Sequence, residues 1–380
     1  MPNAVIVDVL RTPLGRRNGK LKDQHPVDLS AQVLQAIVER NDLDPALVED
    51  VIMGCVMQVG DQGINIARNA ALAAGFPESV VGTTVDRQCG SSQQAAHFAA
   101  QGVIAGAYDV VIAAGVENMS RVPMGSSFIP GSMPFGPEMI ARYPHLVPQG
   151  ISAELIAEKW DISREANDAF SVQSHLRAAR AREEGRFDRE ILPVNNGEED
   201  VSQDEGIRPD STIEKLASLK PAFKPDGVIT AGNSSQITDG ASALLIMTEE
   251  KAAQLGLKPR ARFHTFALAG VDPVMMLTGP IPATTKVLER AKMTLDQIDL
   301  VEINEAFAPV VLSWEKEHHP DMDKVNVNGG AIALGHPLGA SGARLMATLL
   351  NELERTGGRY GLQTMCEGGG MANATIIERL

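Results

Sequence analysis

Hydrophobic residues along the chain fall into short runs separated by longer segments with helical spacing. Residues 4–9, 50–56 and 109–114 are almost continuously apolar, which is typical of strands buried on both faces. Residues 29–40 and 91–105 instead have the spacing of helices. This alternation predicts an α/β fold with mostly buried strands.

The stretch from residue 120 to residue 236 breaks this alternation. It is rich in Pro and Gly between residues 123 and 150, continues as a polar helical passage, and becomes acidic at residues 195–204. We therefore expect it to be an insertion folded over the α/β core. Strand-like runs then return, and strands are predicted at residues 241–247, 298–303, 324–327 and 361–366.

The last third of the chain repeats the order of features in the first third. Segment 50–55 resembles segment 299–304, and segment 108–115 resembles segment 360–368, with about 250 residues between the members of each pair. Two related α/β halves are the simplest interpretation. Strand patterns are common enough for either similarity alone to arise by chance.

The length of the chain bounds the number of domains, and its net charge excludes some classes of partner. The 380 residues exceed the usual size of one hydrophobic core, so we expect two domains, or one large α/β unit with an insertion. The net charge of −14 argues against nucleic acid or an anionic membrane as the main partner. An anionic ligand would have to be bound by local cations.

The three cysteines, Cys55, Cys89 and Cys366, have neither the dense spacing of a disulfide framework nor the CxxC pairs of a zinc site. The N-terminus lacks the basic and apolar regions of a secretion signal, and no apolar run approaches the ~18 residues of a membrane span. We expect a cytoplasmic protein without a metal ion and without a membrane partner.

Cys89 stands where a predicted strand ends and an alanine-rich helix begins. The unpaired N–H groups and the dipole of a helix N-terminus favour a thiolate, so we expect a lowered pKa and a nucleophilic role for Cys89. An isolated cysteine is more often a small buried apolar residue, which is the interpretation we give to Cys55.

Three further segments carry polar residues suited to catalysis. His336, in a glycine-rich loop, could be the general base for Cys89. Cys366 ends a predicted strand just before three glycines whose N–H groups could bind an oxyanion. Asn304 and Glu305 follow another strand, where capping of the next helix by Asn304 is as good an explanation as catalysis.

Together these segments resemble the thiolase family, the acetyl-CoA acyltransferases and acetyltransferases. The motifs are Q-C-G-S at Cys89, N-E-A-F at Asn304, G-H-P-x-G-A-S-G at His336 and C-x-G-G-G at Cys366, in the family's order. The resemblance implies two similar βαβαβαββ halves in a five-layer αβαβα arrangement. Residues 1–118 and 238–258 would form the N-terminal half, residues 119–237 a loop domain, and residues 259–380 the C-terminal half.

The resemblance also implies roles for individual residues. Cys89 would carry the acyl group, His336 would activate it, and Cys366 would be the second acid and base, acting on the α-carbon of acetyl-CoA. His336 and a water held by Asn304 would form one oxyanion hole. The N–H groups of Cys89 and Gly368 would form the other.

The remaining implications concern ligands and assembly. No cofactor would be bound permanently, and coenzyme A and its thioesters would be substrates of a homodimer or homotetramer. Arg208 would contact the nucleotide end of coenzyme A, and Ser235 its pantetheine chain. Apolar positions around the pantetheine and acyl groups would be Phe223, Met276 and Phe307, although ordinary core roles would also suit them.

One departure from the family pattern bears on the substrate. Short-chain biosynthetic thiolases carry a His-Met-Gly segment where this chain has Pro148, Gln149 and Gly150. We therefore expect a degradative thiolase acting on a longer or bulkier 3-ketoacyl-CoA from fatty-acid or sterol side-chain breakdown. The alternatives are a ketoacyl synthase, which pairs its cysteine with two histidines, and a non-catalytic acyl-CoA-binding scaffold.

Overall fold

The computed structural model describes residues 3–380 and is built on one ten-stranded mixed sheet and a separate two-stranded sheet. The long sheet has the order β10-β11-β12-β9-β1-β8-β5-β3-β4, and β2 pairs with β8. The strands are β1 Ala4–Arg11, β2 Gly15–Arg16, β3 Asp50–Gly54, β4 Val81–Val85, β5 Val110–Asn118, β6 Val194–Asn195, β7 Asp200–Val201, β8 Thr238–Thr248, β9 Ala261–Gly270, β10 Leu300–Ile303, β11 Tyr360–Glu367 and β12 Met371–Arg379.

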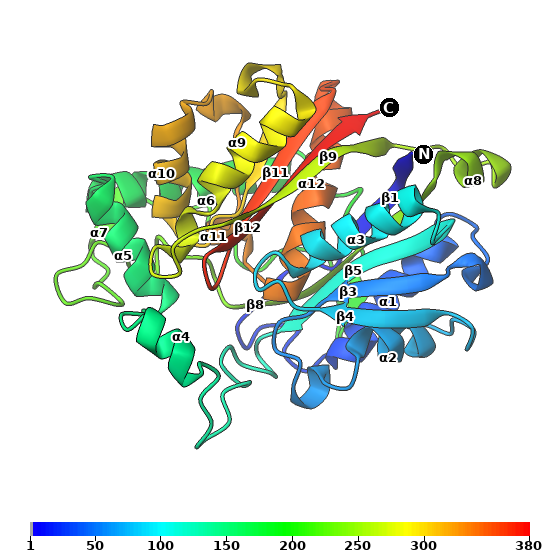
Figure 1. Ribbon diagram of the computed structural model, residues 1–380, viewed down its shortest axis with the longest axis horizontal. Coiled ribbons are helices and arrows are strands. Elements are labelled where there is room, and N and C mark those ends of the chain that lie inside the picture. Colours follow the sequence, from blue (N-terminus) through cyan, green and yellow to red (C-terminus); the bar gives the residue numbers. More distant parts are fainter. Residues whose placement is uncertain (1–2) are drawn as a thin grey trace.

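The long sheet consists of two halves joined by a short contact. Strands β1 and β9 share only the pairs Val5↔Arg262 and Ile6↔Ala261, and Figure 1 shows the strands diverging on either side of this contact. In each half two parallel strands lead into two antiparallel ones: β3, β5, β8 and β1 in one, β10, β11, β12 and β9 in the other. The predicted internal repeat is therefore confirmed, with β3 equivalent to β10 and β5 to β11.

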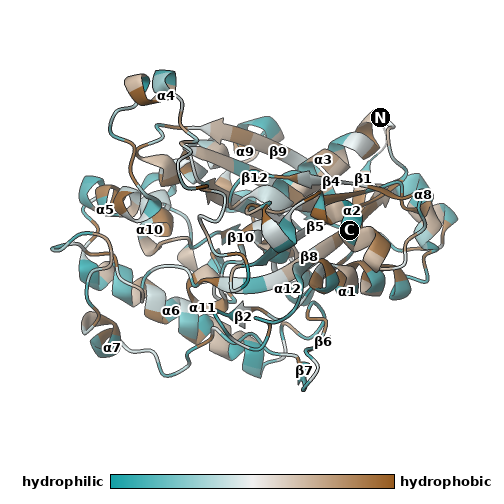
Figure 2. Ribbon diagram, turned by 90° about the horizontal axis from the view of Figure 1, so that it is seen from below, coloured by the Kyte–Doolittle hydropathy of each residue, from teal (hydrophilic) through white to brown (hydrophobic). Residues whose placement is uncertain are grey.

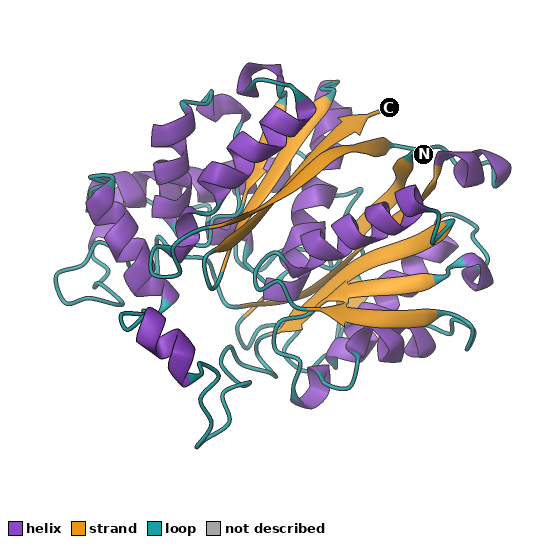
Figure 3. Cartoon of the chain, viewed as in Figure 1, coloured by secondary structure: helices purple, strands orange, loops and turns teal. Residues whose placement is uncertain are grey.

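Helices separate and cover the two half-sheets in five layers (Figures 1 and 3). Helices α1 and α2 pack on the outer face of the first half, and α9 and α10 on the outer face of the second. Helices α3 and α12 lie between the halves, in one core cluster that contains residues of both. The helices are α1 Pro26–Glu39, α2 Ile66–Ala73, α3 Ser91–Ala105, α4 Pro137–Arg142, α5 Gln149–Lys159, α6 Arg164–Glu183, α7 Ile213–Ala217, α8 Glu249–Gln254, α9 Pro280–Ala291, α10 Ala308–His318, α11 Ala331–Leu334 and α12 Ser341–Thr356.

The composition of the central helices follows from their position. Helix α3 is buried from Ser91 to Ala100 except at Phe98, and α12 is buried continuously from Ser341 to Leu353. A helix covered on all sides cannot keep a wide polar face. Small residues along α3, including Ala95, Ala96, Ala99 and Ala100, let both half-sheets approach it closely.

The strand predicted at residues 324–327 is wrong. Residues Met322–Lys324 form a 3₁₀ turn, and only the parallel bridge Val301↔Val325 remains. This bridge lies beside β10 as β4 lies beside β3, so it is the reduced equivalent of β4. The strand stops there because Asn326 has a φ of 46° and its amide bonds to the backbone N–H and C=O of Ile303.

The inserted stretch adds no strand to the long sheet. It contributes α4 to α7 and the small β6-β7 sheet, and Figure 2 places α5, α6 and α7 on one side of the molecule with α10 and α11. Helix α5 packs on α10, and α6 packs on α11. Within residues 3–380, no helix combines the length and apolar character needed to cross a bilayer.

Candidate active site

Cys89 lies in a tight turn between β4 and α3. Gln88 takes a left-handed conformation with φ of 49°, and Gly90 is the N-cap of the helix that begins at Ser91. The Ser91 hydroxyl fixes the turn by accepting from Arg87 N at 2.9 Å and donating to Gln88 O at 2.6 Å. The predicted position of the thiol at a helix start is confirmed, and the thiol is only 3% exposed.

The expected lowering of the Cys89 pKa is wrong. Burial, followed by the nearby Glu367, raises the pKa of Cys89 to about 12. Hydrogen bonds from the Gln149 side chain and from the N–H groups of Cys89 and Gly368 favour the thiolate without offsetting the lost solvation. Cys89 is therefore a thiol at neutral pH and needs a base in the reaction.

His336 has the protonation state of a base. Burial, with a contribution from the Arg344 charge, lowers the pKa of His336 to about 3, so the ring is neutral. Its Nδ1 lies 2.5 Å from Ser341 Oγ, which is also 2.8 Å from the carbonyl of Pro337. If the Ser341 hydroxyl donates its proton to that carbonyl, its oxygen must accept a hydrogen bond from a protonated His336 Nδ1. In this tautomer Nε2 has no proton, and its lone pair can accept one.

Asn304 connects His336 with Cys366. It follows β10, and Cys366 lies near the end of β11, so the two parallel strands deliver both residues to the same sheet edge. The Asn304 amide Nδ2 lies 3.4 Å from His336 Nε2 and also hydrogen-bonds the Cys366 sulfur. It does not cap α10, whose N-cap is Phe307 without a side-chain bond.

Cys366 is fully buried beside Cys89. Burial is the main cause that raises the pKa of Cys366 well above its usual value, and the charge of Cys89 is the next. The two thiols therefore lie close enough for ionisation of one to oppose ionisation of the other. Both are protonated at rest.

The glycines after Cys366 bring the backbone up to the nucleophile. Gly369 and Gly370 each have a φ of 81°, which turns β11 back into β12. The N–H of Gly368 is thereby directed at the Cys89 sulfur, as is the N–H of Cys89 itself. A Cβ atom on Gly368 would lie 3.1 Å from Gln88 Oε1 and 3.2 Å from Gln149 Nε2, so a larger residue here would crowd both polar side chains.

Four of the five predicted substrate-binding residues gather next to Cys366. Met276, Phe307 and Cys366 belong to one apolar cluster, and the Phe223 ring meets that of Phe307 edge-on at 5.9 Å. Ser235 N donates to Ala306 O at 2.9 Å, which places its loop beside the same cluster. The fifth, Arg208, is exposed, and its backbone N donates to His175 Nδ1 at 3.2 Å.

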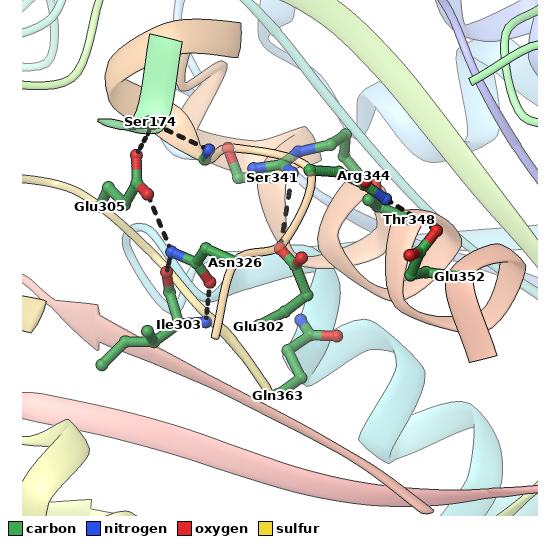
Figure 4. A network of polar contacts seen from close by, with 12 residues as sticks. Ser174, Glu302, Ile303, Glu305, Asn326, Ser341, Arg344, Thr348, Glu352 and Gln363 are labelled. Atoms are coloured by element: carbon green, nitrogen blue, oxygen red, sulfur yellow. Dashed lines mark hydrogen bonds and ion pairs between the residues drawn. The ribbon is translucent and has the colours of Figure 1, made fainter. Parts of the chain in front are cut away.

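Glu305 supports the chain that carries Asn304 (Figure 4). Its buried carboxyl accepts from Ser174 Oγ at 2.7 Å, Asn326 Nδ2 at 2.9 Å and Ile332 N at 3.1 Å. These donors come from α6, from the segment after the Val325 bridge, and from α11. The inserted stretch is thus tied to the strand end where the site is built.

Sequence reasoning missed Glu117, near the end of β5. Its carboxyl is fully buried and gathers the loops around Cys89 and His336. The only sequence signal is an acid inside an apolar strand pattern. Its donors are Val56 N at 3.0 Å, Met57 N at 3.0 Å, Gly339 N at 2.9 Å and Gln62 Nε2 at 2.6 Å.

Replacing Glu117 with glutamine should destabilise the protein by roughly 3 kcal/mol, because one oxygen becomes an NH₂ group that faces N–H donors. Denaturant unfolding measures this difference, with Glu138→Gln at an exposed position as the matched control. An unfolding free energy equal to that of the control would show that these bonds do not hold the loops.

No group of three or more His, Cys, Asp or Glu side chains within residues 3–380 is arranged to hold a metal ion. The groups that the structure brings together here are two thiols, a neutral imidazole, an amide and directed N–H groups. Such a set can form a thioester and move protons between sulfur, nitrogen and carbon.

Comparison with known proteins gives a consistent picture. Residues 4–250 match the family model of the thiolase N-terminal domain, and residues 257–379 match that of the thiolase C-terminal domain. The chain is 52% identical to the steroid 3-ketoacyl-CoA thiolase FadA6 of Mycobacterium tuberculosis, over 100% of this chain and 95% of the relative. It is 48% identical to a 3-ketoacyl-CoA thiolase of Aliivibrio fischeri, with both chains fully covered.

A solved structure shares the whole architecture. The crystal structure of the Bacillus anthracis acetyl-CoA acetyltransferase superposes with a TM-score of 0.92 and 43% sequence identity, covering 100% of this chain and 99% of that one. The five-layer arrangement inferred from the core clusters is thus found in an acetyltransferase of known structure.

Proposed function

The chain belongs to the thiolase family of acyltransferase enzymes, and from this premise we propose that it cleaves a 3-ketoacyl-CoA with coenzyme A, giving acetyl-CoA and a shortened acyl-CoA, or catalyses the reverse condensation. The observation that carries the proposal is that Asn304 contacts both His336 and Cys366, and that Cys366 lies beside Cys89. A ketoacyl synthase would place a second histidine where this site has Cys366.

The first half of the reaction forms the acyl-enzyme. His336 Nε2 takes the proton of Cys89, and the sulfur attacks the 3-keto carbon of the substrate. The bond between C2 and C3 then breaks, and its electrons form the enolate of acetyl-CoA. Cys366 gives its proton to the α-carbon of that enolate, so acetyl-CoA leaves with an uncharged thioester group and Cys366 becomes a thiolate.

The second half transfers the acyl group to coenzyme A. The incoming thiol gives its proton to the Cys366 thiolate and attacks the thioester carbon of Cys89. The Cys89 sulfur leaves and recovers its proton from His336. Every proton taken in the first half is thus returned in the second, and both cysteines end as thiols.

Two oxygens develop negative charge in this scheme, at different steps. We propose that the N–H groups of Cys89 and Gly368 bind the oxyanion of the tetrahedral intermediate. Both N–H groups already point at the Cys89 sulfur, and the carbon that bears the oxyanion is bonded to this sulfur. His336 and a water held by Asn304 would stabilise the thioester oxygen of the enolate. Preorganised donors at each oxygen contribute more to catalysis than a site shared by both.

Residues 119–237 would act as the loop domain for coenzyme A. Arg208 offers an exposed cation to the nucleotide phosphates in a chain whose net charge is −14. Ser235 would contact the pantetheine, and the apolar cluster of Phe223, Met276 and Phe307 would cover its reactive end beside Cys366.

The substrate we propose is longer or bulkier than acetoacetyl-CoA. Gln149, which replaces the methionine of short-chain enzymes, hydrogen-bonds the Cys89 sulfur and so reshapes the acyl site. The preceding stretch exposes apolar side chains, including Met124, Phe128 and Ile129. Two similar proteins bear the names 3-ketoacyl-CoA thiolase and steroid 3-ketoacyl-CoA thiolase.

A substrate panel tests this proposal. Acetyl-CoA formation is measured with acetoacetyl-CoA, a medium-chain 3-ketoacyl-CoA and a sterol-side-chain 3-ketoacyl-CoA. We expect kcat/KM for the better of the two larger substrates to exceed that for acetoacetyl-CoA by at least about tenfold, the scale that a few buried methylenes provide. A preference for acetoacetyl-CoA would contradict the assignment.

A further inference from the structure

The carboxyl of Glu367 is buried beside the nucleophile without a hydrogen-bond partner. Glu367 is the last residue of β11, next to Cys366, and its side chain has no exposure to solvent. Neither carboxyl oxygen finds a partner among residues 3–380. The mechanism above does not use this residue, and an ionised carboxylate buried in this way would be strongly unfavourable.

The carboxyl lies against the residue that follows Cys89. A Cβ atom on Gly90 would lie 2.0 Å from Glu367 Oε1 and 2.6 Å from Asn373 Nδ2. The missing side chain of Gly90 therefore leaves the space that Glu367 occupies. From there the charged form of Glu367 acts on both thiols: it raises the pKa of Cys89, second to burial, and that of Cys366, after burial and the charge of Cys89.

The hydrogen-bonding inventory around Gly90 is short of one donor. Asn373 donates its amide to Gly90 O at 2.9 Å, but its Oδ1 is buried and, in the described part of the chain, without a partner. With the two Glu367 oxygens this makes three acceptors. A proton on Glu367 turns one of them into a donor, whereas ionisation leaves all three unsatisfied.

The charges that face Glu367 do not reverse this preference. Burial is the main cause that raises the pKa of Glu367 to about 9. The charge of Arg87 favours the carboxylate but is outweighed by burial, and the charge of Asp86 opposes the carboxylate. The other titratable neighbours are the thiols of Cys89 and Cys366, which are neutral at rest.

We propose that Glu367 is a positioning residue that acts on Cys89 as a neutral carboxylic acid, and that its ionisation limits the reactivity of Cys89 at alkaline pH. While neutral, it fills the space behind Gly90 and adds no charge next to the sulfur. Once ionised, it sets a negative charge beside the forming thiolate and makes that thiolate harder to form.

Glu367→Gln tests the proposal, because the amide has the shape of the neutral acid and cannot ionise. The readout is the rate of Cys89 alkylation by iodoacetamide, followed by mass spectrometry of its peptide from pH about 7 to about 10. It needs no acyl substrate, so its result is independent of the proposed thiolase function. A thiol below its pKa gains about tenfold in rate per pH unit because the thiolate reacts.

We expect the alkylation rate of the unsubstituted protein to rise less steeply than this above the pKa of Glu367, about 9, where the carboxyl ionises. The variant should keep the slope and be at least about threefold faster at the alkaline end. Gln149→Met is the matched control, because it removes a hydrogen-bond donor to the same sulfur. It should slow alkylation at every pH without changing the pH at which the rate begins to rise less steeply.

Identical slopes in the Glu367→Gln variant and the unsubstituted protein would overturn the proposal. The proposal would also be overturned if the Glu367→Gln variant had the same melting temperature as the unsubstituted protein but its Cys89 were not alkylated at neutral pH. The reactivity of Cys89 would then require the ionised carboxylate. If the glutamine variant does not fold, Glu367→Met, unbranched and uncharged, replaces it in the same comparison.

Discussion

Cys89→Ala is expected to lower the rate of acetyl-CoA formation from a 3-ketoacyl-CoA by at least about four orders of magnitude, the scale of losing a covalent nucleophile. The hydrogen-bond donors around the sulfur would remain but would have no thioester to stabilise. In the unsubstituted protein, mass spectrometry after mixing with substrate should find the acyl group on the Cys89 peptide.

Cys55→Ala is the matched control for this prediction. Cys55 is also a fully buried thiol, and its sulfur lies 3.9 Å from a Glu117 oxygen rather than beside Cys366. We expect this variant to stay within about tenfold of the normal rate. Activity retained in Cys89→Ala, or an acyl group recovered on another cysteine, would show that Cys89 is not the nucleophile.

The sequence predicted the parts of the site that depend on local order. Cys89 at a strand-to-helix junction, Asn304 after β10 and Cys366 near the end of β11 each follow from where an apolar run stops. The internal repeat predicted the equivalence of the two halves. It could not predict that one strand would shrink to a bridge at Val325, because that depends on the amide of Asn326 reaching the backbone of Ile303.

The electrostatics of the site depend on tertiary packing. The sequence indicated a thiolate at a helix N-terminus, but α3 lies between two half-sheets, and the desolvation of Cys89 outweighs the helix dipole. The proton on His336 Nδ1 likewise depends on Ser341, whose hydroxyl donates to the carbonyl of Pro337 in the loop before α12. For Glu117 the sequence offers only an acid inside an apolar strand pattern, because its donors come from three separate segments.

Burial keeps Cys89, Cys366 and His336 uncharged in the resting site. With Cys89 and Cys366 protonated and His336 neutral, the resting pocket contains no net charge from these three groups. Charge appears only when a substrate arrives, and the N–H groups that meet it are already in place. Such a site avoids the cost of a buried thiolate while it waits, and it relies on proton transfer within each step.

Cys366→Ala should separate proton transfer at carbon from chemistry at Cys89. We expect thiolysis to fall by about three orders of magnitude, within the range of a lost general acid, because the enolate has no proton donor. Cys89 should still react with iodoacetamide, because its base and its N–H donors are unchanged. Burial keeps Cys366 protonated at rest, the state that cleavage requires of it in the first step.

Exchange of the α-protons of acetyl-CoA with deuterated solvent gives the decisive readout for Cys366. This exchange needs a base at the α-carbon but no second acyl chain, so it should disappear in Cys366→Ala and persist in the Cys55→Ala control. Exchange at the normal rate would assign the proton transfer at carbon to another group, with His336 and Glu367 the titratable candidates beside the site. Loss of exchange with Cys89 still reactive would separate the two thiols into nucleophile and carbon acid, a division that their shared burial alone does not reveal.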